Sequence, residues 1–319
     1  MRDIEKMKQN KPLIIFDTDM DTDCDDAGAL AMLYEYVKRD KAELLGIVTD
    51  VVSPYAAACC EALGAYYGVE RPIGTVYASE YPEQETNRLS AYRKHSLRVG
   101  DRRYNCMMAD RVKKRDTDYL SAVSVYRRLL ADAPDHSVTV VCVGLLTALD
   151  ALLQSAGDEI SPLSGRELLS SKVTTLVSMG YPDHDGSNFN WDMDSEAAQR
   201  FLSDCPVPMV ISGAGGNVIT GTALSTTFPA NHPLRQIYET FNRGAGRGRA
   251  SWDLIATLYA LEPDTLFLTA VERGTCCYDP EHARSYWQAD GKRRDRDLVM
   301  THSPEATAAA LDARMMGDF

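Results

Sequence analysis

Short apolar runs alternate along this chain with segments whose apolar residues recur at helical spacing. Residues 12–16, 44–48 and 137–143 are compact apolar or β-branched runs, which are typical of buried strands. Between the first two runs, residues 27–37 place apolar side chains three and four positions apart, which predicts an amphipathic helix. Strands that alternate with helices are typical of a parallel sheet covered by helices on both faces.

The same alternation continues to the end of the chain. We expect further helices at 54–67, 119–130, 146–153, 196–202, 233–241, 252–261 and 304–315. We expect further strands at 73–76, 173–179, 209–212, 266–272 and 297–301. The first of these helices is expected to open with Ser53 as its cap and Pro54 at its first position.

The pattern shows neither an internal repeat nor a linker. We therefore expect residues 1–319 to form a single α/β domain with an open, mostly parallel sheet flanked by helices. Residues 78–117 are polar and lack periodicity, so we expect a lid or insertion with short helices there.

Composition narrows the class of protein. Of 319 residues, 45% are hydrophobic and 25% are charged, as in ordinary globular proteins. The longest apolar run, 138–146, is far shorter than the roughly 20 residues of a spanning helix, so we expect no membrane partner. The net charge of −12 argues against nucleic acid as a partner and suits a small neutral substrate or a cation.

Cysteine usage and the N-terminus bear on the compartment. The eight cysteines form no CxxC pair and have no histidine at zinc spacing, which favours a reducing compartment. Residues 1–6 have no apolar stretch of a signal peptide. We expect a cytoplasmic location, although a trimmed signal peptide would leave the same sequence.

A cluster of aspartates follows the first predicted strand directly. Six of them lie within ten residues: Asp17, Asp19, Asp21, Asp23, Asp25 and Asp26. Like charges this close repel one another unless a cation compensates them. Clustered carboxylate oxygens select a hard ion, and several flexible carboxylates favour Ca²⁺ over Mg²⁺. The pattern predicts a cation site, with a solvated acidic turn as the alternative.

Residues 16–30, FDTDMDTDCDDAGAL, resemble the N-terminal signature of the inosine-uridine-preferring nucleoside hydrolase family. The match is to the longer form of a divergent branch, Asp-Thr-Asp-Met-Gly-Asn-Asp-x-Asp-Asp-Ala. Three further segments resemble family motifs in the family's order: 140–149 (VVCVGLLTAL), 188–198 (NFNWDMDSEAA) and 251–261 (SWDLIATLYAL). The resemblance implies an open α/β fold that binds one Ca²⁺ at the base of a pocket. It also implies hydrolysis of the N-glycosidic bond of ribonucleosides to free base and ribose.

The resemblance also implies roles for individual residues. The metal ligands would be the side chains of Asp19, Asp26 and Asp253 and the backbone carbonyl of Val143, with Asp23 as an additional ligand from the longer loop. Asp19 would also take the proton from the metal-bound attacking water. Asp25, Asn188 and Asn190 would bind the ribose.

Two departures from the family pattern concern catalysis. Asn188 stands where the family usually has Glu, so it brings no negative charge to the sugar. Trp252 stands where many members have a His that protonates the leaving base; it can stack on a base but donates no acid proton. His184 is then the candidate leaving-group acid, with a solvated loop histidine as the alternative. Phe189 and Trp191 are expected in the core.

Three functions remain open from the sequence. The first is a Ca²⁺-dependent N-ribohydrolase that acts on a small-molecule nucleoside or riboside, expected as a homo-oligomer, a dimer or tetramer. The second is a non-catalytic or repurposed protein that keeps the metal and binds the sugar. The third is a hydrolase of another ribosylated compound with a good leaving group.

Overall fold

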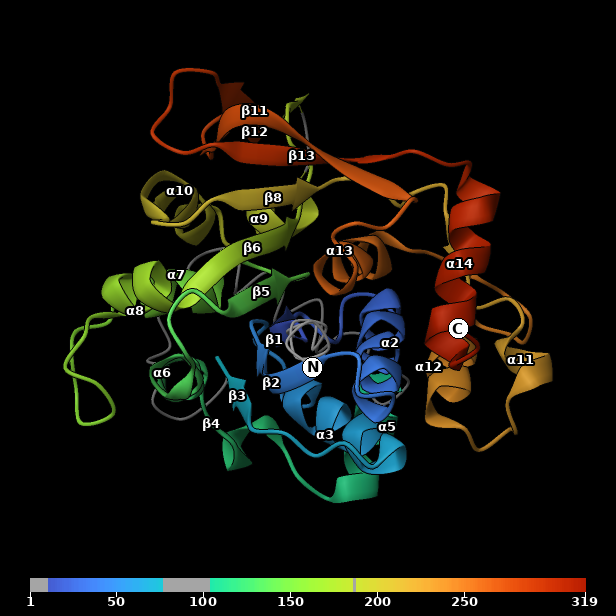
Figure 1. Ribbon diagram of the computed structural model, residues 1–319. Coiled ribbons are helices and arrows are strands. Elements are labelled where there is room, and N and C mark those ends of the chain that lie inside the picture. Colours follow the sequence, from blue (N-terminus) through green and yellow to red (C-terminus); the bar gives the residue numbers. More distant parts are fainter. Residues whose placement is uncertain (1–10, 77–103, 186–187) are drawn as a thin grey trace, which may run out of the picture.

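The computed structural model describes residues 11–76, 104–185 and 188–319. An 11-stranded sheet crosses the molecule in the order β4-β3-β2-β1-β5-β6-β8-β13-β11-β12-β7 (Figure 1). Its strands are β1 (Leu13–Thr18), β2 (Glu43–Thr49), β3 (Ile73–Thr75), β4 (Leu120–Ser121), β5 (Val138–Cys142), β6 (Val173–Met179), β7 (His184–Asp185), β8 (Met209–Ser212), β11 (Leu268–Asp279), β12 (Arg284–Gln288) and β13 (Asp295–Met300). A second, small sheet pairs β9 (Ile219–Thr220) with β10 (Arg249–Ala250).

Helices cover both faces of the large sheet. They are α2 (Asp25–Lys38), α3 (Ala56–Tyr67), α5 (Tyr104–Val112), α6 (Ala122–Asp132), α7 (Thr147–Gln154), α8 (Gly165–Lys172), α9 (Phe189–Met193), α10 (Ser195–Asp204), α11 (Leu224–Thr227), α12 (Pro233–Phe241), α13 (Trp252–Leu261) and α14 (Pro304–Met316), with the 3₁₀ helix η2 (Asp116–Asp118). Figure 1 shows α6, α7 and α8 on one face and α2, α13 and α14 on the other. Successive β1 side chains therefore enter different cores: Ile14 and Phe16 pack with α2, and Ile15 with α6 and α7.

The strand order reverses direction between β1 and β5, which are parallel neighbours at the centre of the sheet. From β1 the chain adds β2, β3 and β4 on one side, and from β5 it adds β6 and β8 on the other. The two strand ends are tied together because the backbone N–H of Val143 donates to the carbonyl of Asp17 at 2.8 Å. Ligands of open α/β sheets bind outside the carboxyl ends of strands at such a reversal.

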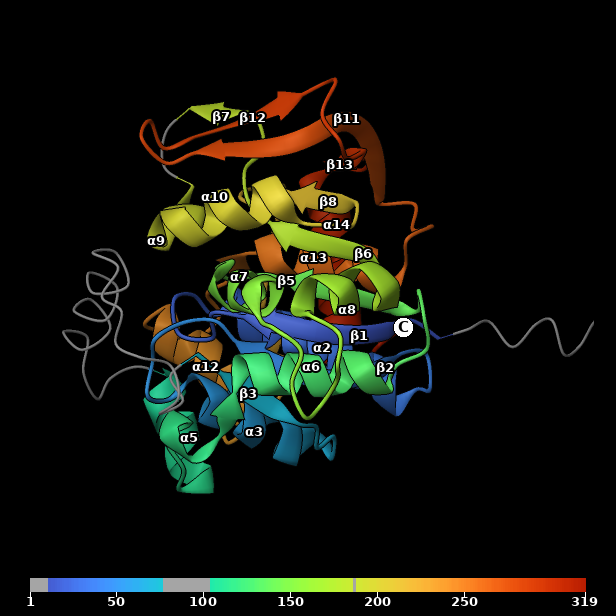
Figure 2. The ribbon, with the colours of Figure 1, turned by 90° about the vertical axis from the view of Figure 1, so that its left-hand side faces the viewer.

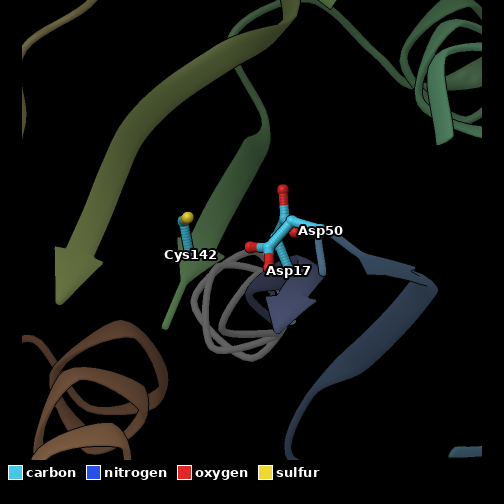
Figure 3. Close-up of side chains that lie close together, drawn as sticks. All are labelled: Asp17, Asp50 and Cys142. Carbon is cyan, nitrogen blue, oxygen red and sulfur yellow. The ribbon is translucent and has the colours of Figure 1, made fainter. Parts of the chain in front are cut away.

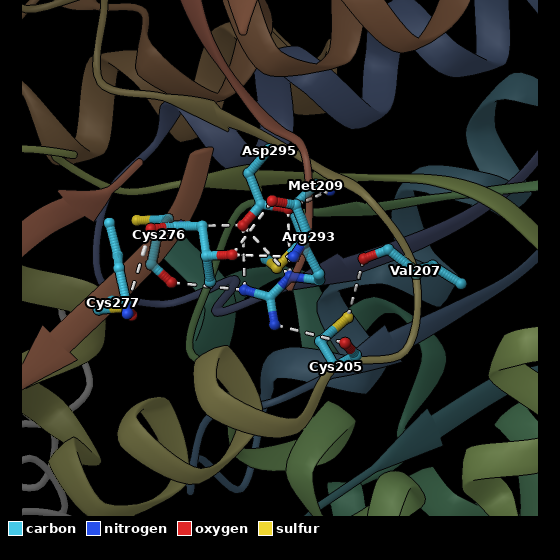
Figure 4. Close-up of polar contacts among 9 residues, drawn as sticks. Cys205, Val207, Met209, Cys276, Cys277, Arg293 and Asp295 are labelled. Atoms are coloured by element: carbon cyan, nitrogen blue, oxygen red, sulfur yellow. Dashed lines mark hydrogen bonds and ion pairs between the residues drawn. The ribbon is translucent and has the colours of Figure 1, made fainter. Parts of the chain in front are cut away.

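An antiparallel edge extends the parallel part of the sheet (Figure 2). There β11 pairs with β13 and β12, and β12 pairs with β7. A buried ion pair fixes this edge: Arg293 donates Nε–H to Asp295 at 3.1 Å, and Asp295 accepts the backbone N–H groups of Met209 and Cys276 at 3.0 and 2.9 Å (Figure 4). The carboxylate thus joins β8 to β11, so loss of either charge would leave its partner buried and unpaired.

The expected fold class is confirmed, with corrections at particular elements. Helix α3 begins at Ala56 rather than at Pro54, because its first N–H groups are capped from elsewhere: the Asp116 carboxylate accepts from Ala57 at 3.0 Å and from Ala58 at 3.3 Å. The helix expected from 119 begins at Ala122 instead, after strand β4.

Several elements lie outside the expected set, among them the short elements β4, β7, β9, β10, α9 and α11. Helix α8 was not predicted, although Ser164 and Glu167 form a capping box at its start. Strand β12 was also missed. The lid expected at 78–117 falls partly outside the described residues, and its described part contains α5 and η2. In the ranges that the structure describes, every helix is too short or too polar to span a bilayer.

Candidate active site

Three carboxylates meet where two helices begin. Asp25 and Asp26 occupy the first turn of α2, and Asp253 lies in the first turn of α13. Each places one oxygen atom within 4.8 Å of the other two, and all three are buried. The backbone N–H of Asp253 donates to Oδ2 of Asp25 at 3.2 Å, which holds the two helix ends together. Helix N-termini carry partial positive charge, which stabilises carboxylates there.

Among the described residues, too few positive charges and hydrogen-bond donors surround these carboxylates to balance their negative charge. Burial raises the pKa values of Asp25, Asp26 and Asp253 well above the ordinary range, and the neighbouring carboxylates raise them further. The Thr18 hydroxyl donates to Oδ1 of Asp26. The other oxygen of this carboxylate, Oδ2, has no hydrogen-bond donor among the described residues. A buried all-oxygen cluster with an unpartnered oxygen fits a hard divalent cation.

Asp19 lines the same pocket beside this three-carboxylate group. Burial raises its pKa to about 7, against the opposing effect of the Thr22 hydroxyl, which donates to Oδ2 at 2.6 Å. A carboxylate with a pKa near neutrality is suited to accept a proton from water. Close by, the Val143 carbonyl accepts from Nδ2 of Asn190 at 2.7 Å and keeps a second lone pair.

The surrounding pocket has a volume of about 220 Å³ and is graded in polarity. Its lining comprises Asp19, Thr22, Asp23, Asp25, Asp26, Val143, Met179, Tyr181, Phe189, Asn190, Arg249, Trp252 and Asp253. The carboxylates at its base are almost fully buried, with Asp26 1% and Asp253 4% exposed, whereas Phe189 is 44% exposed. The base is therefore acidic, and the mouth is aromatic.

Most of the residues singled out from the sequence line this pocket, and Asp23 does so with its carboxylate engaged by Arg249. Asp23 accepts from Nε of Arg249 at 2.8 and 2.9 Å through its two oxygens. Asn188 is buried outside the lining and donates from Nδ2 to the Tyr181 carbonyl at 3.1 Å. The backbone of His184 lies in β7, and its side chain lies outside what the structure describes.

Some lining residues were not predicted. Neither Arg249 nor Tyr181 belongs to a motif in the sequence. Arg249 meets Asp23 only through the fold, because the two residues are 226 positions apart. The expectation that Phe189 lies in the core is wrong, since its exposed ring is at the pocket mouth. The corresponding expectation for Trp191 is confirmed, because its side chain is fully buried.

A second pair of buried carboxyl groups lies outside the pocket lining. Asp17 and Asp50 lie side by side at the ends of β1 and β2, next to Cys142 (Figure 3). The Tyr126 hydroxyl donates to Asp17, and burial raises the pKa of Asp17 to about 7 and that of Asp50 well above its ordinary range. A Cβ at Gly144 would lie 2.5 Å from both Asp50 oxygens, so only glycine fits this close approach.

One family of known proteins matches almost the whole chain. A model of the inosine-uridine preferring nucleoside hydrolase family matches residues 14–317. Comparison with curated protein sequences gives no match.

Similar solved structures cover nearly the whole chain. An inosine-uridine preferring nucleoside hydrolase from Bacillus anthracis has 16% identity and a TM-score of 0.64, over 97% of this chain and 100% of that one. A plant nucleoside hydrolase, PpNRh1, has 16% identity and a TM-score of 0.66, over 96% and 99%. The type III effector protein XopQ, complexed with adenosine diphosphate ribose, has 15% identity and a TM-score of 0.66, over 99% and 96%.

Proposed function

The chain belongs to the inosine-uridine preferring nucleoside hydrolase family, and from this premise we propose that it hydrolyses the N-glycosidic bond of ribonucleosides in a Ca²⁺-dependent reaction. The observation that carries the proposal is the buried group of Asp25, Asp26 and Asp253 at the base of the pocket. It would hold both a cation and the hydroxyl-rich end of a nucleoside.

The donor set supports Ca²⁺ as the cofactor. We propose that Asp19, Asp26, Asp253 and the Val143 carbonyl hold it, since all four line one pocket and offer only oxygen. When bound, the ion would supply charge that fixes the ribose diol and orients the attacking water. Asp23 remains a candidate ligand, although its carboxylate is engaged by Arg249.

The protein side chains then have separate tasks. Asp25 and Asn190 bind the ribose hydroxyls, and Asn188 supports the sugar from beside the pocket. Asp19 accepts the proton of the attacking water, whose oxygen bonds to the anomeric carbon. The C–N bond breaks, and its electron pair leaves with the base. Buried carboxylates near the sugar stabilise the positive charge that develops in such a transition state.

The proton for the leaving base is assigned to His184. His184→Ala should then reduce kcat for inosine by about 100-fold or more, as loss of a general acid does. It should spare a p-nitrophenyl riboside, whose leaving group departs as a stable anion. Equal losses on both substrates would show that the residue only shapes the pocket.

The proposal is tested by incubating the Ca²⁺-loaded protein with purine and pyrimidine ribonucleosides and measuring released reducing sugar. Release is expected from the native chain and not from Asp19→Asn. Metal retention without sugar release from any nucleoside or from the nitrophenyl riboside would contradict it. That outcome would favour the alternative of a metal-dependent binding protein, for which Trp252 in place of an acid residue at the pocket mouth is the supporting observation.

A further inference from the structure

We propose that Arg249 selects the nucleobase: its guanidinium fork donates to the adjacent N7 and O6 acceptors of a 6-oxopurine while Trp252 stacks on the ring. The inference rests on the proposed function and names the substrate class of the same pocket. It predicts preference for 6-oxopurine ribosides over adenosine and uridine.

The position of Arg249 places it at the leaving-group end. It belongs to β10 and lines the pocket together with Phe189, Tyr181 and Trp252, which are more exposed than the carboxylates at the base. A nucleoside whose sugar occupies the acidic base therefore directs its nucleobase toward Arg249. Aromatic rings at the pocket mouth can stack on a planar base and can also make cation–π contacts with a guanidinium.

The guanidinium is held in a fixed orientation. Its Nε donates to both oxygens of Asp23 at 2.8 and 2.9 Å, and Nη2 donates to the same carboxylate. Its Cζ lies 5.4 Å from the ring centroid of Phe241 and 5.6 Å from that of Trp252. An arginine fixed by a carboxylate and two rings loses little further side-chain entropy when it binds a ligand.

Donors remain free on this fixed group. An arginine has five N–H donors, and those on Nη1 of Arg249 have no acceptor among residues 11–76, 104–185 and 188–319. Together with the second N–H of Nη2, they form a fork that matches two adjacent acceptors. Arginine pairs with the N7 and O6 of guanine in this way.

The same fork discriminates against other bases. Adenine presents an amino donor beside N7, so two donors would face each other without a bond. Uracil lacks the paired N7 and O6 acceptors altogether. The C–N electron pair that leaves with the base also raises the electron density at N7, next to the cationic group.

The test compares kcat/KM for inosine, 7-deazainosine, adenosine and uridine in the native protein, Arg249→Met and Arg249→Lys. We expect the native protein to prefer inosine to each of the other three by about 10- to 100-fold, the range given by a good bidentate pair. Arg249→Met should abolish this preference through loss of inosine cleavage. Arg249→Lys keeps the charge but not the fork, so its preference should stay close to that of Arg249→Met.

A control two residues before Arg249 is Arg247→Met. Arg247 is exposed and donates from Nη1 to the Asn242 carbonyl at 3.1 Å, so its removal should leave the inosine-to-adenosine ratio unchanged. A p-nitrophenyl riboside has no N7 or O6, and its cleavage should fall much less than that of inosine in Arg249→Met.

Three results would overturn the inference. Equal losses on all ribosides would make Arg249 merely structural. A native preference for inosine 5′-monophosphate over inosine that Arg249→Met removes would show that the fork reads phosphate. If the native protein cleaves no riboside, the proposed function fails separately. In that case, base selection is tested by measuring the affinities of inosine and adenosine for the Ca²⁺-loaded protein by calorimetry. Equal affinities would contradict base selection by Arg249.

Discussion

At the scale of single residues, the site is defined by carboxylates that are buried without enough positive charge around them. Asp26 is the clearest case, because it is 1% exposed and its Oδ2 has no donor among the described residues. Natural proteins satisfy nearly all buried polar atoms, and an exception calls for an ion or a water molecule. The shortage of donors therefore supports the proposed cation site.

Asp26→Ala should lose the bound metal, because it removes one of the three carboxylates of the buried group. Elemental analysis of purified protein should show about one Ca²⁺ per chain in the native protein and almost none in the variant. Asp118→Ala removes an exposed carboxylate of η2 and should retain the native stoichiometry. Zinc or iron as the sole metal in the native protein would contradict the assignment.

Asp19→Asn should keep most of the metal and lose turnover. The amide still offers a carbonyl oxygen to a cation, but it cannot accept a proton from water. We expect kcat to fall by about 100-fold or more, the contribution of a general base, while Ca²⁺ content stays close to native. Unchanged kcat in this variant would remove Asp19 as the base.

At the scale of elements, two helix starts and one glycine turn build the pocket. The first turns of α2 and α13 bring the carboxylates together, and the turn at Gly215 packs against the start of α13. Gly215 has φ +133°, and a Cβ there would lie 2.6 Å from the backbone of Trp252. Its carbonyl also accepts the N–H of Ser251 at 3.1 Å, so this turn sets the position of Trp252.

Gly215→Ala should therefore displace Trp252 and raise KM for nucleosides. The variant should also lose more than about 1 kcal/mol of unfolding free energy, since alanine at positive φ is strained even without a clash. The matched control is Gly246→Ala, where φ is +69° but a Cβ meets nothing within 4 Å. Urea unfolding should show a smaller loss there, with KM unchanged; equal effects of both changes would contradict the packing argument.

The elements also show what the sequence could and could not predict. Helix 252–261 and strand 209–212 are confirmed at both ends, because local apolar spacing determines them. The predicted start of α3 was wrong because the N-terminus of this helix is capped by Asp116, which lies 59 residues beyond Ala57. Acidic residues of the pocket were found as a cluster next to a strand, but Arg249 reaches Asp23 only through the fold. Local pattern identifies strands and carboxylates, whereas long-range pairs need the structure.

At the scale of the whole molecule, buried acidic groups gather near the centre of the sheet, where the strand order reverses between β1 and β5. Burial raises the pKa values of Asp17 and Asp19 to about 7, and it also raises those of Asp25, Asp50 and Asp253 well above their ordinary range. Such groups favour the native state when protonated. For Asp17 and Asp19, this contribution to the stability of the metal-free protein is present below about pH 4 and is lost as the pH rises through about 7.

Calcium should reverse that loss, because it binds the deprotonated carboxylates of the native state only. The rise in melting temperature on adding Ca²⁺ to protein freed of metal by dialysis should be larger at about pH 8 than at about pH 5. Scanning calorimetry at both pH values checks this, with Asp26→Ala showing no Ca²⁺-induced shift at either. A larger shift at the lower pH would contradict the linkage between carboxylate charge and cation binding.

The central claim is that one cation at the buried carboxylates makes this pocket a nucleoside hydrolase. The most direct measurement is a titration of metal-free protein with Ca²⁺ in the presence of inosine, recording the initial rate of ribose release. The account predicts no release without Ca²⁺ and a rate that saturates as about one ion binds per chain. Full activity of the metal-free protein, or saturated Ca²⁺ binding without any ribose release, would contradict it.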